Sequence, residues 1–267
     1  VAACFLATIG PGMLLILLLC LINWIKMRAG HDPLQQPVGF RQRAEEIGNS
    51  MWKAFPALLL PVIILGGIYG GVFTPTEAAA IAVVYSIPVG LFIYRELDLK
   101  RLAECFIAAA TTTGVIMVIL VFSFVASRIF TLERVPQQLT DLLMDLFQNK
   151  LLILLVVNVF LILLGMIMDD VSVVAIISPL LLPVMVNIGV EPIQFAAIVG
   201  TSVVIGCNSP PMAPILFMTC RIGNVGMSQV MRPALGFMAF AALPVMLVTT
   251  YWPPLSLYLP RAFGYIG

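Results

Sequence analysis

The stretch Leu151–Cys220 constrains the fold of this chain most, because it contains two long apolar segments that polar residues interrupt near the middle. The interruptions are Gly165, Asp169, Asp170 and Ser172 in the first segment, and Gly206, Asn208, Ser209, Pro210 and Pro211 in the second. Two interrupted apolar segments close together in sequence are typical of transporters that bind their solute at membrane depth. The stretch therefore predicts a transporter binding site.

Composition excludes a water-soluble fold. The 267 residues are 61% hydrophobic and only 10% charged, whereas soluble domains are about 25% charged, and the mean hydropathy is +1.08. A net charge of +1 leaves no basic face for nucleic acid. The five cysteines lack the spacing of a zinc site or a disulfide framework. The single histidine, His31, is expected to be a solvated loop residue, because it lacks partner ligands.

Apolar segments alternate with basic loops, and the loops Lys26–Lys53, Arg95–Arg101 and Arg221–Arg232 are expected in the cytoplasm by the positive-inside rule. One polytopic transporter domain is predicted. Its parts are a membrane helix with a cytoplasmic loop (1–53), two helices around a glycine-rich break (54–101), a membrane helix with an amphipathic arm (102–150), a re-entrant hairpin with a broken helix (151–220), and a last membrane helix with the C-terminus (221–267).

Several details of this organisation can be predicted from local patterns. Pro11 suggests a bend or a late start in the first membrane helix. Ala44–Phe55 is expected to form a short amphipathic helix on the membrane surface. Leu102–Ser127 is predicted to cross outward, and the leucines of Arg128–Lys150 follow the spacing of an amphipathic arm at the outer surface. Pro233–Tyr251 is predicted to be the final span, with an aromatic belt after it.

The segment Ala54–Tyr94 is apolar but too long for one span, and both of its flanks are expected inside. It must therefore leave and return as two spans joined by a tight turn. The dividing residues are Gly66, Gly67, Gly70, Gly71, Thr74, Pro75, Thr76 and Glu77. Thr74 fits an N-cap, with Pro75 at the first helical position and Glu77 three residues after the cap. A cap alone and a part in a transport mechanism both stay open for these residues.

Charge counting leaves the fold of Leu151–Val186 open. The stretch enters from the outside at Lys150 and must end inside at Arg221, which requires an odd number of crossings. A re-entrant hairpin and two full spans both satisfy this requirement. No Lys or Arg occurs between Leu151 and Cys220, and a cytoplasmic turn would normally carry one. The hairpin is therefore favoured.

Five motifs carry a resemblance to a known family. They are GGIYGGVFTPTEAAAIAVVYS (66–86), YRELDLKRL (94–102), GMIMD (165–169), IIS-P-LLLPV (176–184) and IGCNSPPMAP (205–214). In order and spacing they closely resemble the large membrane subunit of tripartite ATP-independent periplasmic (TRAP) transporters. The resemblance runs through essentially the whole chain.

The resemblance implies an all-α membrane protein with an inverted-repeat, elevator-type fold. Its second repeat would hold one re-entrant hairpin (151–186) and one broken helix (195–220). It implies the large permease of a sodium-coupled importer of an organic acid, such as a C4-dicarboxylate, keto acid, sugar acid or sialic acid. A periplasmic solute-binding protein would deliver the acid, and a small four-helix membrane subunit would accompany the permease. Sodium would be the coupling ion in a bacterial inner membrane, with no other cofactor.

The chain departs from the family in length. The family's first repeat, with its hairpin and most of its broken helix, has no counterpart here, and residues 1–30 match only the helix that follows them. The chain begins at Val1 without a signal peptide. We therefore read the chain as the C-terminal portion of a longer protein, which would not transport alone.

The chemistry expected at the two breaks follows from helix ends. A C-terminal helix end directs carbonyl groups at a cation, and an N-terminal end directs N–H groups at an anion. The sodium candidates are Gly165, Asp169, Asp170, Thr201, Ser202 and Gly206, with Asn208 and Ser209 as further oxygen ligands. The substrate candidates are Ser172, Asn208, Ser209 and Pro210. A carboxylate at membrane depth costs about 2.5–3.5 kcal/mol, which argues against an idle aspartate there.

Plainer roles stay open for the same residues. Asp170 would serve as a simple N-cap, Asp169 as a turn residue at the membrane surface, and Pro210 as part of a plain kink. A membrane scaffold without a ligand path, and a sodium- or proton-coupled carrier that needs no binding protein, are the alternative functions. An intramembrane enzyme is not supported, because neither HExxH nor GxSxG occurs.

Overall fold

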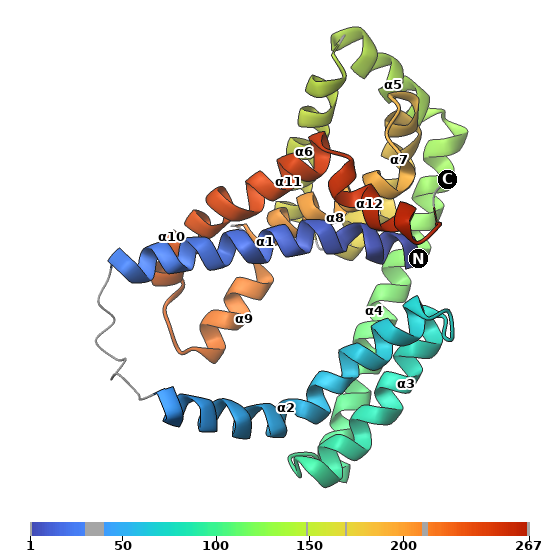
Figure 1. Cartoon of the computed structure of the whole chain (residues 1–267). Helices are drawn as coiled ribbons and strands as arrows, with labels where there is room; N and C mark the ends of the chain where they lie inside the picture. Colours follow the sequence, from blue (N-terminus) through green and yellow to red (C-terminus); the bar gives the residue numbers. More distant parts are fainter. Residues whose placement is uncertain (1, 30–39, 148, 169, 210–212, 266–267) are drawn as a thin grey trace. The chain divides into compact units, whose positions relative to one another are not determined.

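The computed structural model describes residues 2–29, 40–147, 149–168, 170–209 and 213–265, and within these ranges every regular element is a helix (Figure 1). The elements are α1 (Ala2–Ala29), α2 (Phe40–Tyr69), α3 (Pro75–Pro88), the π-helical turn η1 (Val89–Ile93), α4 (Leu99–Leu132), α5 (Val135–Leu146), α6 (Lys150–Ile167), α7 (Asp170–Asn187), α8 (Pro192–Asn208), α9 (Pro214–Ile222), α10 (Met227–Phe237), the π-helical turn η2 (Met238–Ala242), α11 (Leu243–Tyr251) and α12 (Pro254–Ala262). The predicted all-α class is confirmed, whereas the elevator-type inverted repeat stays a prediction. His31 lies outside the described residues.

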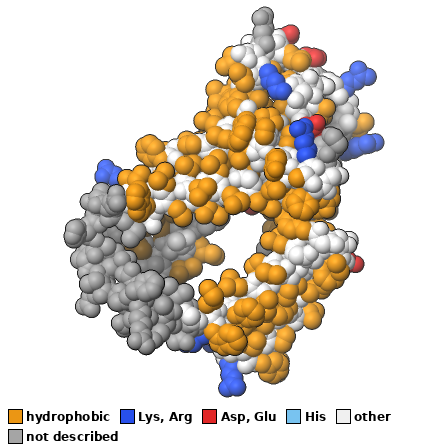
Figure 2. All heavy atoms as spheres, in the orientation of Figure 1, with side chains coloured by type: hydrophobic (Ala, Val, Ile, Leu, Met, Phe, Trp, Pro, Cys, Tyr) orange, Lys and Arg blue, Asp and Glu red, His pale blue; other side chains and the backbone are white. Residues whose placement is uncertain are grey.

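Seven helical stretches among the described residues are long and apolar enough to cross a membrane. They are Ala2–Lys26, Ser50–Tyr69, Pro75–Ile93, Leu99–Leu132, Lys150–Ile167, Asp170–Asn187 and Met227–Tyr251. Figure 2 shows hydrophobic side chains over much of the surface that it colours, with few charged ones among them. An apolar exterior of this kind is expected of a protein whose solvent is lipid.

The structure divides into two compact units. In the first unit (29–114), α2 and α3 form a helical hairpin around the predicted glycine-rich turn. The hydroxyl of Tyr85 donates a hydrogen bond to the carbonyl of Pro56 at 2.8 Å, and the hydroxyl of Tyr94 donates one to the carbonyl of Lys53 at 2.8 Å. Two apolar helices joined by a tight turn are therefore present as predicted, and that both of them cross the membrane stays a prediction.

Three predicted boundaries are wrong. The late start at Pro11 is contradicted, because α1 runs through this residue, whereas the alternative of a bend there stays a prediction. Ala44–Phe55 is not a separate surface helix but the first part of α2, which continues without interruption into an apolar span. The last span begins at Met227 rather than at Pro233, which α10 accommodates inside the helix. In each case the helix continues past a local polarity or proline signal. Helices in an apolar environment tolerate proline and glycine, because ending the helix there would leave more backbone groups without partners.

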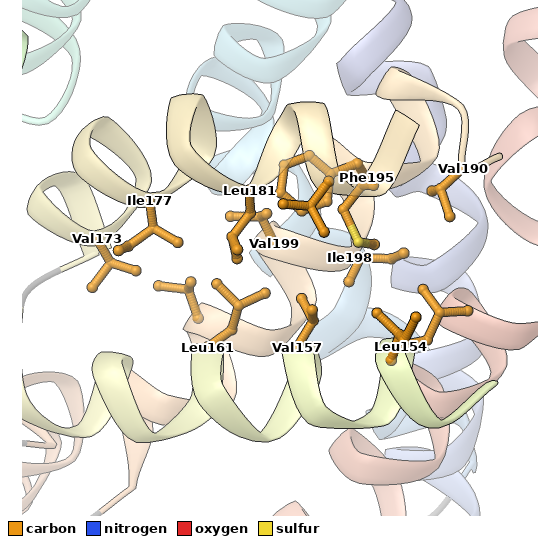
Figure 3. Close-up of a cluster of buried hydrophobic side chains, with 14 of the residues drawn as sticks. Leu154, Val157, Leu161, Val173, Ile177, Leu181, Val190, Phe195, Ile198 and Val199 are labelled. Atoms are coloured by element: carbon orange, nitrogen blue, oxygen red, sulfur yellow. The ribbon is translucent and has the colours of Figure 1, made fainter. Parts of the chain in front are cut away.

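The second unit (3–28 and 115–267) is organised around α8. The helices α6, α7, α11 and α12 all contact it. Figure 3 shows Leu161 and Val157 of α6 facing Leu181 and Ile177 of α7, with Ile198 and its neighbours on α8 in the same cluster. Because α8 is buried on several sides, it can be apolar all round.

The amphipathic arm is confirmed as a helix, α5. Its Leu139 and Leu143 pack against the core cluster, whereas Leu142 and Leu146 are exposed. After α7 the chain turns at Gly189, whose φ of 75° lies in the left-handed region that glycine adopts without a Cβ penalty. The side chain of Lys150 donates a hydrogen bond to the carbonyl of Gly189 at 3.0 Å, which joins the start of α6 to the end of α7.

Candidate functional site

The first break separates α6 from α7. The helix α6 ends at Ile167, and Met168 leaves the helix in an extended conformation (φ −118°, ψ 159°). The carboxylate of Asp170, the first residue of α7, accepts a hydrogen bond from the backbone N–H of the next residue, Val171, at 3.0 Å. Ser172, two residues after Asp170, is buried. Asp169 lies outside the described residues.

The second break separates α8 from α9. Ser209 is extended (φ −91°, ψ 146°), and Ala213, directly before α9, has a φ of 32°. The Asn208 side-chain amide donates to the carbonyl of Val204 at 2.8 Å, and the Ser209 hydroxyl donates to the carbonyl of Ile205 at 2.7 Å. Both substrate candidates therefore satisfy carbonyl groups in the last turn of α8. Pro210 and Pro211 lie outside the described residues.

Two glycines bring the breaks together. Gly165 in the last turn of α6 and Gly206 in the last turn of α8 are both buried, and their backbones are in contact. A Cβ atom on Gly206 would lie 2.5 Å from the carbonyl oxygen of Ile162 and 2.8 Å from the Cα of Gly165. Only residues without a side chain permit this approach. The two sodium candidates are therefore also the packing contact between the interrupted helices.

The two helix C-termini consequently converge. The thiol of Cys207 on α8 lies 3.7 Å from the carbonyl oxygen of Met168, the C-cap of α6. A helix C-terminus carries carbonyl groups without intrahelical partners and about half a negative charge. Two such ends in one place produce a region of negative potential that suits a cation with oxygen ligands. This donor chemistry fits sodium.

A buried polar network adjoins the glycine contact. Asn158 of α6 is fully buried; its side-chain amide donates to the Thr250 hydroxyl at 3.0 Å, and its carbonyl oxygen accepts from Ser202 at 2.8 Å. Gln194 donates to the backbone carbonyl of Thr250 at 3.1 Å. The network joins α6, α8 and α11 about 10 Å along α6 from Gly165, at 1.5 Å per residue.

Sequence reasoning missed Asn158, Gln194 and Thr250. A single polar residue inside the run LLILLVVNVFLILL was the available signal, because an amide in an apolar helix needs a partner on a neighbouring helix. Ser202 was predicted as a sodium candidate, and the structure places its hydroxyl in this network. The partners were not predictable, since they are 44 and 92 residues from Asn158.

Thr201 faces a different direction from Ser202. Its hydroxyl donates to the carbonyls of Ala197 and Ile198 within its own helix, at 2.9 and 3.1 Å. The residue lines an apolar cavity of about 300 Å³ that α1, α8, η2 and α11 enclose. Thr201 and Ser202 are both sodium candidates, and they have different partners on different faces of α8.

The glycine-rich break belongs to the first unit. Gly70 donates to the carbonyl of Gly66 at 2.9 Å, and the carbonyl of Gly67 accepts from both Val72 and Phe73, so the chain turns within a few residues. Gly67 also lies directly beneath the Phe73 ring, where a side chain would collide.

The predicted capping box at the start of α3 is confirmed. The hydroxyl of Thr74 accepts from the backbone N–H of Glu77 at 3.3 Å, and the Glu77 carboxylate accepts from the backbone N–H of Thr74 at 2.7 Å. Pro75 is the first helical residue, and Thr76 follows it with an exposed side chain. Helix capping thus accounts for the pattern Thr74–Glu77.

In the described part of the chain, seven helical stretches are able to cross a membrane, and two helix breaks meet near a buried polar network. These features define a multi-pass α-helical membrane protein. Residues 1–255 match the family described as the tripartite ATP-independent periplasmic transporter, DctM component, and the chain belongs to this family. It is accordingly a protein of the bacterial inner membrane, from a family of transporters and not of enzymes.

Three relatives illustrate the similarity. The chain is 36% identical over 264 residues to the uncharacterized protein YgiK of Salmonella typhimurium (99% of this chain, 59% of YgiK). It is 36% identical over 210 residues to the isethionate TRAP transporter permease protein DctMQ of Oleidesulfovibrio alaskensis (79% and 33%). It is 33% identical over 260 residues to the C4-dicarboxylate TRAP transporter large permease protein DctM of Pseudomonas aeruginosa (97% and 60%). The chain thus spans at most three fifths of these relatives.

Proposed function

We propose that this chain is part of the large permease of a TRAP transporter that imports an organic acid together with sodium. The names of two relatives, one for isethionate and one for C4-dicarboxylates, support a small organic anion as the solute. A C4-dicarboxylate, keto acid or sugar acid remains our proposed class. A periplasmic solute-binding protein would deliver the acid, and a small four-helix membrane subunit would accompany the permease.

One observation carries the sodium part of the proposal. The last turns of α6 and α8 meet at Gly165 and Gly206, so that two negative helix ends face one region. Carbonyl and hydroxyl oxygens near this point, including that of Ser209, would hold the ion. The substrate carboxylate would face the N–H groups at the start of α7, near Ser172. Neutralising two helix ends with a cation would favour the approach of an anion to the same place.

Sodium-dependent uptake by the full-length transporter tests the proposal. The permease is reconstituted in liposomes with the small subunit and the binding protein encoded beside it, and uptake of succinate or isethionate is measured against sodium concentration. Ser209→Ala removes a hydroxyl at the second break. We expect the sodium concentration for half-maximal uptake to rise about tenfold, because the ion would lose one oxygen ligand; tenfold corresponds to about 1.4 kcal/mol.

The matched control is Ser256→Ala. Ser256 is also a buried serine bonded to a backbone carbonyl, that of Pro253 at 3.3 Å, but it lies in α12. We expect near-normal sodium dependence for this variant. If Ser209→Ala behaves like Ser256→Ala, the proposed ion site is wrong. If the unchanged transporter takes up the acid equally well with and without sodium, sodium coupling itself is refuted.

A further inference from the structure

The first unit contains a groove that the transport site does not involve. It has a volume of about 530 Å³ and lies between α3 with its π-helical turn η1 and the first part of α4. Its apolar lining includes Val83, Ile87, Leu102 and Phe106. These residues belong to two stretches long enough to cross a membrane, so the groove runs along spans and not across a soluble surface.

The mouth of the groove differs chemically from its interior. Tyr94 and Glu96 line it at the point where η1 ends and the chain turns toward α4. The hydroxyl of Tyr94 is held by the carbonyl of Lys53, and a tyrosine with a polar tip and an apolar ring is typical of the membrane interface. The groove therefore runs from the level of the lipid head groups into the apolar zone.

Charges of both signs meet at this mouth. The guanidinium of Arg101 donates a hydrogen bond to the backbone carbonyl of Glu96 at 2.9 Å, and the side chain of Glu96 itself is exposed. Asp98 is engaged differently, because its carboxylate accepts from the backbone N–H of Arg101 at 2.7 Å and caps the start of α4. Lys100 adds a second cation in the same turn.

We propose that this groove binds a glycerophospholipid with a zwitterionic, amine-bearing head group. One acyl chain would lie along the apolar lining. The phosphate would pair with Arg101, and the ammonium group would donate to the carboxylate of Glu96. A head group with one charge of each sign matches the mouth, whereas a purely anionic lipid would leave Glu96 opposed by like charge.

A native cysteine reports occupancy of the groove. Cys105 lines the groove and is exposed, and Cys20 on α1 is exposed in the other unit and serves as an internal reference. The delipidated full-length protein is labelled with N-ethylmaleimide in detergent, and both sites are quantified by peptide mass spectrometry. With phosphatidylethanolamine at about ten times its dissociation constant, we expect Cys105 labelling to slow about tenfold and Cys20 labelling to stay unchanged.

Two pairs of variants test the head-group and acyl-chain contacts separately. Glu96→Gln should weaken protection by phosphatidylethanolamine, whereas Glu104→Gln, an exposed residue of α4 outside the lining, should not. Ala109→Phe fills the groove and should abolish protection, whereas Ala110→Phe, its neighbour outside the lining, should preserve it. Phosphatidylcholine, whose quaternary amine cannot donate a hydrogen bond, should protect less.

Equal protection by phosphatidylcholine and phosphatidylethanolamine in all variants would show that bulk lipid alone covers Cys105, and would overturn the proposal. Protection that requires the small membrane subunit and no lipid would overturn it as well, since the occupant would then be a protein helix.

Discussion

Replacing Gly206 by alanine should separate the two helix breaks. The added Cβ would lie 2.5 Å from the carbonyl oxygen of Ile162, about 0.9 Å inside the 3.4 Å at which ordinary contact begins. The obstructing atoms belong to the backbone of α6, so no side-chain rotation can relieve the contact. Overpacking of this kind costs about 1–3 kcal/mol, and alanine regains up to about 1 kcal/mol in helix propensity. We expect a net loss of about 1–2 kcal/mol.

Two other glycines on the same helices serve as comparisons for the destabilisation expected of Gly206→Ala. Gly200→Ala makes the same change on α8 where a Cβ meets nothing within 4 Å, and it should be neutral or slightly stabilising. Gly165→Ala should be intermediate, because its Cβ would lie 2.9 Å from the carbonyl oxygen of Val203. Gly200→Ala should therefore be the most stable of the three variants, Gly165→Ala the next, and Gly206→Ala the least stable.

Thermal unfolding of the purified full-length protein in detergent, followed by intrinsic fluorescence, measures this order. At about 2–4 °C per kcal/mol, Gly206→Ala should unfold roughly 2–8 °C below the unchanged protein. Equal unfolding temperatures for Gly206→Ala and Gly200→Ala would refute the backbone contact between α6 and α8.

Two further substitutions test the polar network and the cap. Asn158→Leu removes the amide that bonds Ser202 and Thr250. Interhelical hydrogen bonds in membranes contribute about 0.6 kcal/mol each and up to about 1.7. Asn158→Leu should therefore lower the free energy of unfolding by about 1–2 kcal/mol in the same assay. An unchanged unfolding temperature would contradict the network. Thr74→Ala removes the capping box and should lower the free energy of unfolding by about 1 kcal/mol. The control is Thr76→Ala, at an exposed position, which should change it by no more than about 0.5 kcal/mol. Equal effects of the two substitutions would show that the cap does not stabilise α3.

The helix boundaries that could be predicted are those set by neighbouring residues. Thr74, Pro75 and Glu77 form the capping box that their spacing indicates, because each hydrogen bond closes within three residues. The start of α2 was misjudged for the opposite reason. Polar residues near Trp52 marked a change of environment, but they did not interrupt the backbone hydrogen bonds that continue into the apolar part of the same helix.

The candidate site could be predicted in part. The interruptions at Met168 and Ser209 were visible because polar and helix-breaking residues stand out in an apolar run. The hydrogen-bond partners of Asn208 and Ser209 could not be predicted. Their side chains cap the last turn of α8, and a sequence does not show which carbonyl a hydroxyl or an amide will reach.

By itself the sequence determined that the chain crosses a membrane, where its helices are interrupted and how α3 begins, since these properties depend on composition and on contacts a few residues apart. Only the tertiary structure decided that Gly165 lies against Gly206, and that Asn158 bonds Ser202 and Thr250 across 44 and 92 residues. The physical reason is that apolar helices can pair in many ways with similar hydrophobic gain. Backbone approach at glycine and the need of each buried polar group for a partner select one arrangement.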